Sequence, residues 1–244
     1  MAVAKKLKTI IVLPAYNAEK TLEKTVREIP QEVVEEIILV DDKSHDKTVK
    51  IARKLNLTVF RHRKNRGYGA NQKTCYLLAL KHHPDIVVML HPDYQYDPKI
   101  IKYFVEFISE GRFDVMLGSR IRSRHEALAG GMPLYKYLGN RFLTIVENLV
   151  SGYNLSEWHT GMRAYKREVL ENIDFLKNSD DFLFDSQILF QIIEKGYRIG
   201  EIPVPVRYFP EASSINFKSS LKYGLGTLAV ATKFLAKKIL PWNT

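Results

Sequence analysis

Apolar runs alternate with stretches of helical periodicity along the first ninety residues of the chain. The apolar runs are rich in Ile, Leu and Val, and they predict strands at 9–13, 37–41, 57–62 and 85–90. Between them, apolar residues recur at helical spacing and predict helices at 18–29, 47–55 and 70–81. Strands and helices that alternate in this way form right-handed crossovers, so we expect an α/β fold with a parallel, doubly wound sheet.

The fourth apolar run ends abruptly in polar residues, within the stretch DIVVMLHPDYQYDP at 85–98. It predicts a central strand buried on both faces, whose polar groups lie at the carboxyl end, where open α/β sheets bind ligands. The loop carries the imidazole of His91 and the carboxylate of Asp93, which suit a divalent cation that also holds phosphate oxygens. Asp97 and Pro98 then indicate a helix N-cap and a first helical residue. An acidic turn without a ligand is the alternative interpretation.

Beyond this loop the alternation is less regular. The next expected elements are an amphipathic helix at 99–109, a strand at 114–118, a short strand within 158–165, a helix at 182–194 and an amphipathic helix at 217–239. The region at 120–141 is basic, and we expect it to be irregular. These elements predict a single α/β domain at 1–210, followed by a C-terminal amphipathic helical extension at 211–244.

The composition indicates how large a core the chain can bury and which charge its binding partners carry. With 244 residues, of which 45% are hydrophobic, the chain can bury the core of one large α/β domain. Its 37 Lys and Arg against 27 Asp and Glu give a net charge of +10. This charge favours an anionic partner, which leaves phosphates, nucleic acid and an acidic membrane surface open.

Cysteine usage and hydropathy indicate the compartment. Cys75 is the only cysteine, which excludes an intrachain disulfide and a cysteine-rich zinc site and fits a reducing environment. The first residues lack the apolar segment of a signal peptide, and no uncharged apolar run reaches about 18 residues. We therefore expect a cytoplasmic protein that is soluble or peripheral to the membrane.

Two common nucleotide-binding fingerprints are absent. Gly67 and Gly69 follow the third strand instead of the first, Gln72 stands where the third glycine of a dinucleotide fingerprint belongs, and no GxxxxGK[ST] phosphate loop occurs. A nucleotidyltransferase would share the sheet, yet the first loop, PAYNAE, lacks the glycines that such enzymes use. The carboxylates of Asp41 and Asp42 end the second strand, where they either accept hydrogen bonds from a ribose hydroxyl or base NH, or serve as turn and cap residues.

Seven motifs occur in order along the chain: LPAYNAEKTLEKTV, ILVDDKSHDKT, NRGYGANQKT, HPDYQYDP, GSR, WHTGMRAYKREVL and FLFDSQIL. In this order and spacing, the chain resembles a family 2 glycosyltransferase of the GT-A fold. Within that family it is most similar to the polyprenyl- or dolichyl-phosphate sugar synthase-like enzymes. The resemblance covers about residues 8–210. It implies an enzyme with a nucleotide-diphosphate-sugar donor and a divalent cation, Mn or Mg.

The resemblance also implies which residues bind the donor and the cation. Those expected around the nucleotide, the phosphates and the transferred sugar are Pro14, Tyr16, Asn17, Asp41, Asp42, Asn71, His159, Thr160 and Arg163. The metal loop of the family corresponds to His91, Asp93 and Gln95. His91 replaces a carboxylate, and imidazole is a fair ligand for Mn but a poor one for Mg. Asp93 is therefore expected to carry the metal, while His91 assists it or contacts phosphate. A nucleotide-sugar binder without catalytic activity is the alternative.

For the acceptor, the resemblance implies a membrane-borne polyprenyl phosphate. Arg120 and Arg141 are the expected ligands of its phosphate, because arginine forks suit phosphate oxygens. A phosphate oxygen is already an anion and can attack C1 of the sugar directly. If the acceptor is instead a glycan hydroxyl, a base must remove its proton, and Asp181 or Asp185 is the candidate. We expect no nucleic acid partner.

The segment at 217–239 has an apolar face and a basic face. At about 100° per residue, one arc of about 80° holds Phe217, Leu221, Leu225, Leu228, Leu235 and Ile239. A separate side holds Lys218, Lys222, Lys233 and Lys237. One interpretation packs the apolar stripe onto the sheet and leaves the lysines in water. The other lays the helix on an anionic bilayer, where each lysine adds up to about 1 kcal/mol of binding free energy.

Overall fold

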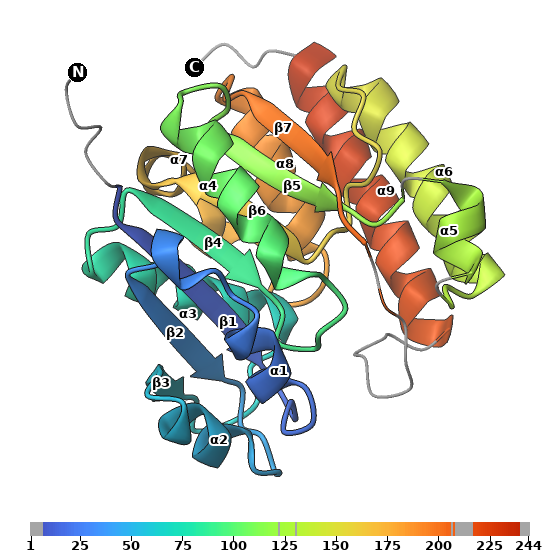
Figure 1. Ribbon diagram of the computed structural model, residues 1–244. Helices are drawn as coiled ribbons and strands as arrows, with labels where there is room; N and C mark the ends of the chain where they lie inside the picture. Colours follow the sequence, from blue (N-terminus) through green and yellow to red (C-terminus); the bar gives the residue numbers. More distant parts are fainter. Residues whose placement is uncertain (1–6, 122, 130, 206, 208–216, 240–244) are drawn as a thin grey trace.

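The computed structural model describes residues 7–121, 123–129, 131–205, 207 and 217–239. At its centre is a seven-stranded sheet in the order β3-β2-β1-β4-β6-β5-β7 (Figure 1). The strands are β1 (Thr9–Ala15), β2 (Glu36–Asp41), β3 (Thr58–Arg61), β4 (Ile86–Leu90), β5 (Val115–Ser119), β6 (Met162–Lys166) and β7 (Ile199–Pro203). Neighbours are parallel except that β6 runs antiparallel to β4 and β5. The expected α/β class with a mostly parallel sheet is confirmed.

Helices cover both faces of the sheet, and alternate side chains of each strand enter two separate cores. Ile10 and Val12 of β1 belong to one core, whereas Ile11 and Leu13 belong to the other. The first core is closed by α3 (Tyr68–Lys81), α7 (Arg167–Asn172) and α8 (Phe184–Glu194). The second is closed by α1 (Leu22–Arg27), α2 (Thr48–Lys54) and α4 (Ile101–Ser109). Cys75 of α3 is fully buried in the first core, and this burial raises the pKa of its thiol.

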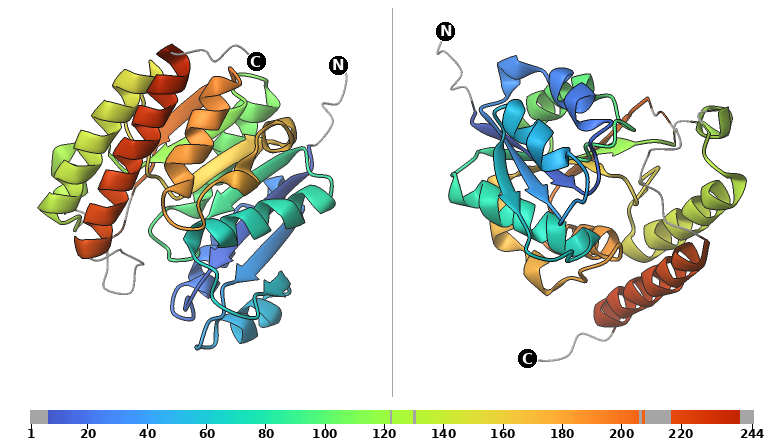
Figure 2. Two further views of the ribbon diagram at one scale, coloured as in Figure 1. Left: turned by 180° about the vertical axis from the view of Figure 1, so that it is seen from behind. Right: turned by 90° about the horizontal axis from the view of Figure 1, so that it is seen from below.

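Three helices form a further layer beside the β5 and β7 end of the sheet. They are α5 (Arg124–Ala129), α6 (Leu134–Ser151) and α9 (Phe217–Ile239), and α6 and α9 lie side by side along their length (Figure 2). The expectation of an irregular region at 120–141 is therefore wrong from α5 onward. Apolar residues do recur at helical spacing in α6, but basic residues interrupt them and obscure the pattern. Arg122 and Gly130 lie outside the described residues.

The elements expected in the first half are present, with shifted ends. The helix expected at 18–29 is shortened to α1, and before it the N–H groups of Ala18 and Glu19 donate to the side chains of Thr48 and Asp46. Asp97 caps the helical turn before α4 as expected, accepting the N–H of Lys99 at 3.0 Å. The edge strand β7 was not predicted, because its sequence IGEIP has neither a long apolar run nor a clear alternation.

Helices α6 and α9 turn apolar side chains toward solvent. On α9, Leu221, Leu225 and Ile239 are 59, 62 and 65% exposed, whereas Thr227 and Ala231 are buried. The interpretation that packs the apolar stripe onto the sheet is therefore wrong. On α6, a second exposed stripe consists of Leu134, Leu138, Phe142, Ile145 and Leu149. Within the described part of the chain, no helix combines the length and apolarity that crossing a bilayer requires.

Candidate active site

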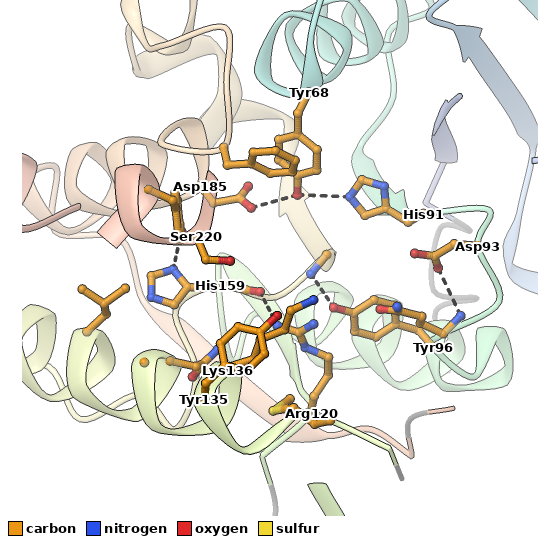
Figure 3. Close-up of a pocket in the computed structure, with 18 residues that line it drawn as sticks. Tyr68, His91, Asp93, Tyr96, Arg120, Tyr135, Lys136, His159, Asp185 and Ser220 are labelled. Atoms are coloured by element: carbon orange, nitrogen blue, oxygen red, sulfur yellow. Dashed lines mark hydrogen bonds between the residues drawn. The ribbon is translucent and has the colours of Figure 1, made fainter. Parts of the chain in front are cut away.

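Two cavities adjoin at the edge of the sheet where the parallel strands have their carboxyl ends. The strand-end cavity is lined by the segments that follow β1 to β4. The helix-walled cavity lies beside it and reaches α6 and α9 (Figure 3). Its lining includes Gln95, Tyr96, Arg120, Tyr135, Lys136, Asn140, His159, Asp185, Ser220 and Tyr223. Both cavities share Tyr68, His91, Asp93 and Phe182, so these residues mark where two bound molecules would meet.

The strand-end cavity collects most of the residues expected around a nucleotide. They are Pro14, Tyr16, Asn17, Asp42 and Asn71. Asn17 joins two of the loops, because its Oδ1 accepts the backbone N–H of His45 at 2.9 Å. The amide of Asn71 donates to the carbonyl of Val40 at 3.1 Å, and its buried Oδ1 has no partner within the described residues. The Oδ1 of this cavity-lining residue is therefore a hydrogen-bond acceptor without a partner among the described residues.

The neighbouring carboxylates Asp41 and Asp42 have separate positions. Asp41 is fully buried and lines neither cavity; its Oδ2 accepts the Nε–H of Arg61 at 3.0 Å and the N–H of Ser44 at 3.1 Å. Asp42 lines the strand-end cavity and accepts two backbone N–H groups of the loop after β3 at 2.8 and 3.0 Å. Asp41 thus binds within its own turn and to β3, and Asp42 is the carboxylate of the pair that lines the strand-end cavity.

Tyr68 stands where the two cavities meet. Its ring stacks on the imidazole of His91, with centroids 5.3 Å apart (Figure 3). Its hydroxyl donates to Asp185 at 2.8 Å and lies 3.2 Å from Nε2 of His91. Because the hydroxyl has only one proton to donate, Nε2–H of His91 supplies the second hydrogen bond, which leaves the lone pair on Nδ1. Gly161 makes room for this arrangement, since a Cβ there would collide with the His91 ring.

His91 and Asp93 are the candidate side-chain ligands for a divalent cation. Burial lowers the pKa of His91 and favours the neutral imidazole that binds metals, while the nearby Asp93 acts in the opposite direction. Burial also raises the pKa of the Asp93 carboxyl, whose Oδ1 accepts the N–H of Gln95 at 3.1 Å. Among the described residues, no three His, Cys, Asp or Glu side chains group as a metal site. The pair fits a cation that takes its other ligands from a diphosphate and water.

Basic side chains from three elements face the helix-walled cavity. Arg120 follows β5, Lys136 belongs to α6, and His159 lies in the loop before β6. Burial lowers the pKa of the Lys136 amine, and the positive charge of Arg120 acts in the same direction. His159 connects the two outer helices, with Nδ1 2.6 Å from the hydroxyl of Tyr223 and Nε2 3.1 Å from the Glu147 carboxylate. Arg120 and Lys136 are thus the cationic side chains of this cavity, and such groups suit an anionic ligand.

The two candidate bases differ in position. Asp185 lines the helix-walled cavity, but three donor groups already contact its oxygens. The hydroxyl of Tyr68 and the amide of Gln72 donate to them at 2.8 and 3.2 Å, and the guanidinium of Arg163 forms an ion pair at 3.3 Å. Asp181 lines neither cavity; its carboxylate accepts a backbone N–H just before α8. Asp185 therefore connects three side chains next to the cavity, and Asp181 binds only within its own turn among the described contacts.

Residues 10–174 match the family model described as glycosyl transferase family 2. The chain belongs to this family. An uncharacterized protein of Methanocaldococcus jannaschii is 32% identical over 198 residues, which is 81% of each chain. UDP-N-acetylglucosamine–dolichyl-phosphate N-acetylglucosaminyltransferase of Methanococcus voltae is 27% identical over 215 residues, covering 81% of this chain and 85% of that one.

A solved structure supports the same fold for this family 2 glycosyltransferase. Glucosyl-3-phosphoglycerate synthase from Mycobacterium tuberculosis, in complex with Mn²⁺, UDP-glucose and phosphoglyceric acid, superposes with a TM-score of 0.71 at 18% sequence identity. The match covers 94% of this chain and 80% of that one. At this identity the likeness shows the fold alone, and the expected GT-A fold is confirmed.

Three residues expected at the site of this family 2 glycosyltransferase lie behind the cavities. Arg141 of α6 donates to the carbonyl of Ser156 at 2.7 Å and lines neither cavity. Arg163 is fully buried and donates to the carbonyls of Trp158 and Thr160. Thr160 is also buried and donates to a carbonyl of β5. These contacts shape the loop before β6, from which His159 reaches the cavity.

Sequence reasoning missed several lining residues of the enzyme. The sequence pattern assigned no role to Tyr68, which stands between Gly67 and Gly69, or to Lys136, which lies in the basic region at 120–141. Asn140 and Tyr223 carried no signal at all, because each lies on a helix whose neighbours are distant in sequence. A helical-periodicity test over 134–151 would have placed Lys136 and Asn140 on one face of α6, opposite its apolar stripe.

Proposed function

We propose that this nucleotide-sugar glycosyltransferase transfers its sugar to an acceptor phosphate, foremost a polyprenyl phosphate at a membrane surface, with the help of Mn²⁺ or Mg²⁺. The proposal assigns the nucleotide to the strand-end cavity and the acceptor phosphate to the helix-walled cavity. The sugar would lie between them, beside Tyr68, His91 and Asp93. Support comes from the shared lining of the two cavities at these residues.

For the donor, Asp93 would hold the cation together with Nδ1 of His91, and the diphosphate would complete its ligands. A cation so placed would offset the negative charge that develops on the leaving diphosphate. Asp42 and Asn71 would bind the nucleoside. Both line the strand-end cavity, and Oδ1 of Asn71 has no hydrogen-bond partner among the described residues. Gln95 lines the helix-walled cavity beside Asp93 and would contact the same phosphates.

The observation that favours a phosphate acceptor is the contrast between the engaged carboxylate of Asp185 and the cationic side chains that line the same cavity. Asp185 is engaged by three donors and is poorly placed to accept a proton from a hydroxyl, whereas Arg120 and Lys136 line the same cavity. A phosphate needs no base, because its oxygen already carries a negative charge. That oxygen would form the new bond to C1 while the bond from C1 to the donor diphosphate breaks, and the nucleoside diphosphate would leave.

The outer helices favour a lipid-borne acceptor. Helices α6 and α9 wall the cavity on one side and expose apolar stripes on the other. Exposed Lys222 and Lys233 flank the stripe of α9 and would attract anionic headgroups. A relative acts on dolichyl phosphate by its name, which agrees with this placement. The protein would then lie on the cytoplasmic membrane face as a peripheral enzyme.

An assay with matched acceptors tests the proposal. The full chain would be incubated with labelled UDP- or GDP-sugars and Mn²⁺ or Mg²⁺, with farnesyl phosphate or farnesol as the acceptor. We expect transfer to farnesyl phosphate, giving a product that mild acid cleaves, and none to farnesol. Transfer to farnesol or to a glycan, without transfer to the phosphate, would return Asp185 to the role of base. Nucleotide-sugar binding without any transfer or hydrolysis would indicate a binding protein.

A further inference from the structure

Glu157 is a buried carboxylate behind the helix-walled cavity, and it lines neither cavity. Its side chain is fully excluded from solvent, yet it is surrounded by donors. Its Oε2 accepts the backbone N–H of Arg120 at 2.6 Å, and its Oε1 accepts the Nε–H of Arg120 at 2.8 Å. The Nη2 group of Arg120 also donates to Oε1. One carboxylate therefore binds the main chain and the guanidinium of the same residue.

This double attachment fixes the direction of the Arg120 side chain. A second acceptor, the carbonyl of His159, receives Nη2 of Arg120 at 2.7 Å (Figure 3). The Arg120 guanidinium also lies over the ring of Tyr96, 6.0 Å from its centroid. An unrestrained arginine side chain has about 2 kcal/mol of rotamer entropy to lose on binding. Here Arg120 is already held in one orientation before a ligand arrives, which lowers the entropic cost of binding.

Glu157 also binds a residue of α6. Its Oε1 accepts the side-chain amide of Asn140, on α6, at 3.2 Å. Arg120 and Asn140 come from the end of β5 and from α6, and both line the helix-walled cavity. A single buried carboxylate thus sets the relative position of two cavity-lining donors that belong to separate elements.

We propose that Glu157 is the positioning residue for acceptor binding, and that it acts by holding Arg120 and Asn140 in the orientation that receives the acceptor anion. The identity of that anion as a phosphate rests on the proposed function. Because the charge of Glu157 offsets that of Arg120, its contribution is the direction of the guanidinium and not additional attraction. No atom of Glu157 takes part in the transfer itself.

The chain provides a matched control in Glu201 of β7. Its carboxylate accepts the backbone N–H groups of Ser156 and Glu157 at 2.8 and 3.0 Å, so it holds the same loop. Among the described residues, the hydrogen bonds of the Glu201 carboxylate go to these two N–H groups. Replacing Glu201 by Gln therefore removes a loop-holding charge without directly releasing the guanidinium of Arg120.

The experiment compares Glu157→Gln, Glu201→Gln, Arg120→Ala and the double variant Arg120→Ala with Glu157→Gln. The acceptor probe is farnesyl phosphate, and donor affinity is measured separately by calorimetry with Mn²⁺. We expect Glu157→Gln to raise the KM for farnesyl phosphate at least tenfold and to leave donor affinity within twofold. Glu201→Gln should lower the melting temperature and leave that KM within twofold. The Glu157 effect should shrink in the Arg120→Ala background to the part that acts through Asn140, since coupled residues are not additive.

A second measurement does not depend on the acceptor. Exchange of the Arg120 Nε proton with solvent, followed by NMR of the full chain, reports directly whether the guanidinium is held. We expect slow exchange in the wild type and in Glu201→Gln, and fast exchange in Glu157→Gln. If Glu157→Gln fails to fold, Glu157→Asp, which keeps the charge but retracts it, takes its place.

The outcomes separate the two proposals. Failure of the wild type to use farnesyl phosphate would overturn the acceptor class, while the exchange rates would still decide the role of Glu157. Unchanged exchange in a folded Glu157 variant would overturn the positioning role. Equal and additive losses from Glu157→Gln and Glu201→Gln would overturn it as well, because they would indicate a general effect on the loop.

Discussion

The two cavities at the sheet edge are assembled in opposite ways. The strand-end cavity takes nearly all of its lining from segments that directly follow β1 to β4, so residues close in sequence are close in the site. The helix-walled cavity takes Arg120, Lys136, His159 and Tyr223 from four separate elements. The first depends on sheet topology, whereas the second depends on how α6 and α9 pack beside the sheet. We therefore expect single substitutions to act severely in the first cavity and by degrees in the second.

Removing the carboxylate of Asp93 should have the largest effect. We expect Asp93→Ala to lower kcat/KM at least a hundredfold, which corresponds to about 2.7 kcal/mol of transition-state stabilisation. The reason is that Asp93 lies at the junction of the cavities, where it would supply the hard oxygen ligand of the proposed cation. Transfer assays across Mn²⁺ and Mg²⁺ concentrations measure it, with circular dichroism as the check on folding.

His91 provides the comparison for Asp93. His91→Ala should weaken metal or donor binding by roughly tenfold, and His91→Asp should shift the preference from Mn²⁺ toward Mg²⁺, because a carboxylate is the harder ligand. An Asp93→Ala enzyme that keeps its activity in either metal would contradict the proposed role of Asp93. It would also contradict the expectation that single substitutions act more severely in the strand-end cavity.

Substitutions of the two arginines that the sequence predicted for the acceptor site should now differ in their effect on transfer. Arg120→Ala should lower transfer about tenfold, or about 1.4 kcal/mol, because a guanidinium facing the cavity is lost. Arg120→Lys should restore activity only in part, since lysine cannot make the fork contact. Arg141→Ala should cost less than threefold and chiefly lower the melting temperature, because Arg141 donates to the carbonyl of Ser156. Equal kinetic losses at both positions would show that Arg141 moves into the cavity when substrates bind.

The outer faces of α6 and α9 should contribute a smaller, graded effect on membrane binding. Leu138→Gln with Phe142→Gln should weaken co-sedimentation with anionic liposomes about fivefold at every salt concentration, since apolar area is lost. Lys222→Glu with Lys233→Glu should weaken it mainly at low salt, because charges are screened over about 8 Å at physiological ionic strength. Leu176→Gln, at an exposed leucine elsewhere, is the control. If all four proteins sediment alike, the stripes have another use.

The smallest effect is expected at Asp114, which lines neither cavity. Hydrogen bonds from Arg198 hold the pKa of this carboxyl well below its usual range, and Lys166 adds to the effect. Stability from the pair is therefore complete above the unfolded pKa of about 4 and is lost as the pH falls below it. Asp114→Asn should lower the melting temperature by about 2–4 °C at pH 7, by less at pH 3, and leave transfer unchanged. An equal shift at both pH values would assign the loss to packing instead of charge.

The contrast between the cavities also explains what the sequence could predict. The position of Asp42 and Asp93 at the ends of strands could be predicted, because each follows an apolar strand whose end is visible in the hydrophobic pattern, and both line a cavity there. The burial of Asp41 away from both cavities was not predictable, since its partner Arg61 lies on the neighbouring strand. Arg141 was expected at the acceptor because of its charge, but the orientation of α6 turns it toward Ser156. Sequence periodicity thus locates strand ends well, and it locates the contacts of a helix only once its neighbours are known.

The burial of Cys75 has a practical consequence for testing whether this enzyme binds a bilayer. The chain has one thiol, and it lies sealed in the core beneath the sheet with its reactivity suppressed. A cysteine introduced at the exposed position of Leu138 or Leu225 would therefore be the one reactive thiol of the folded protein. Spin labels attached there, one position at a time, would report immersion depth along α6 and α9 without background from the natural cysteine.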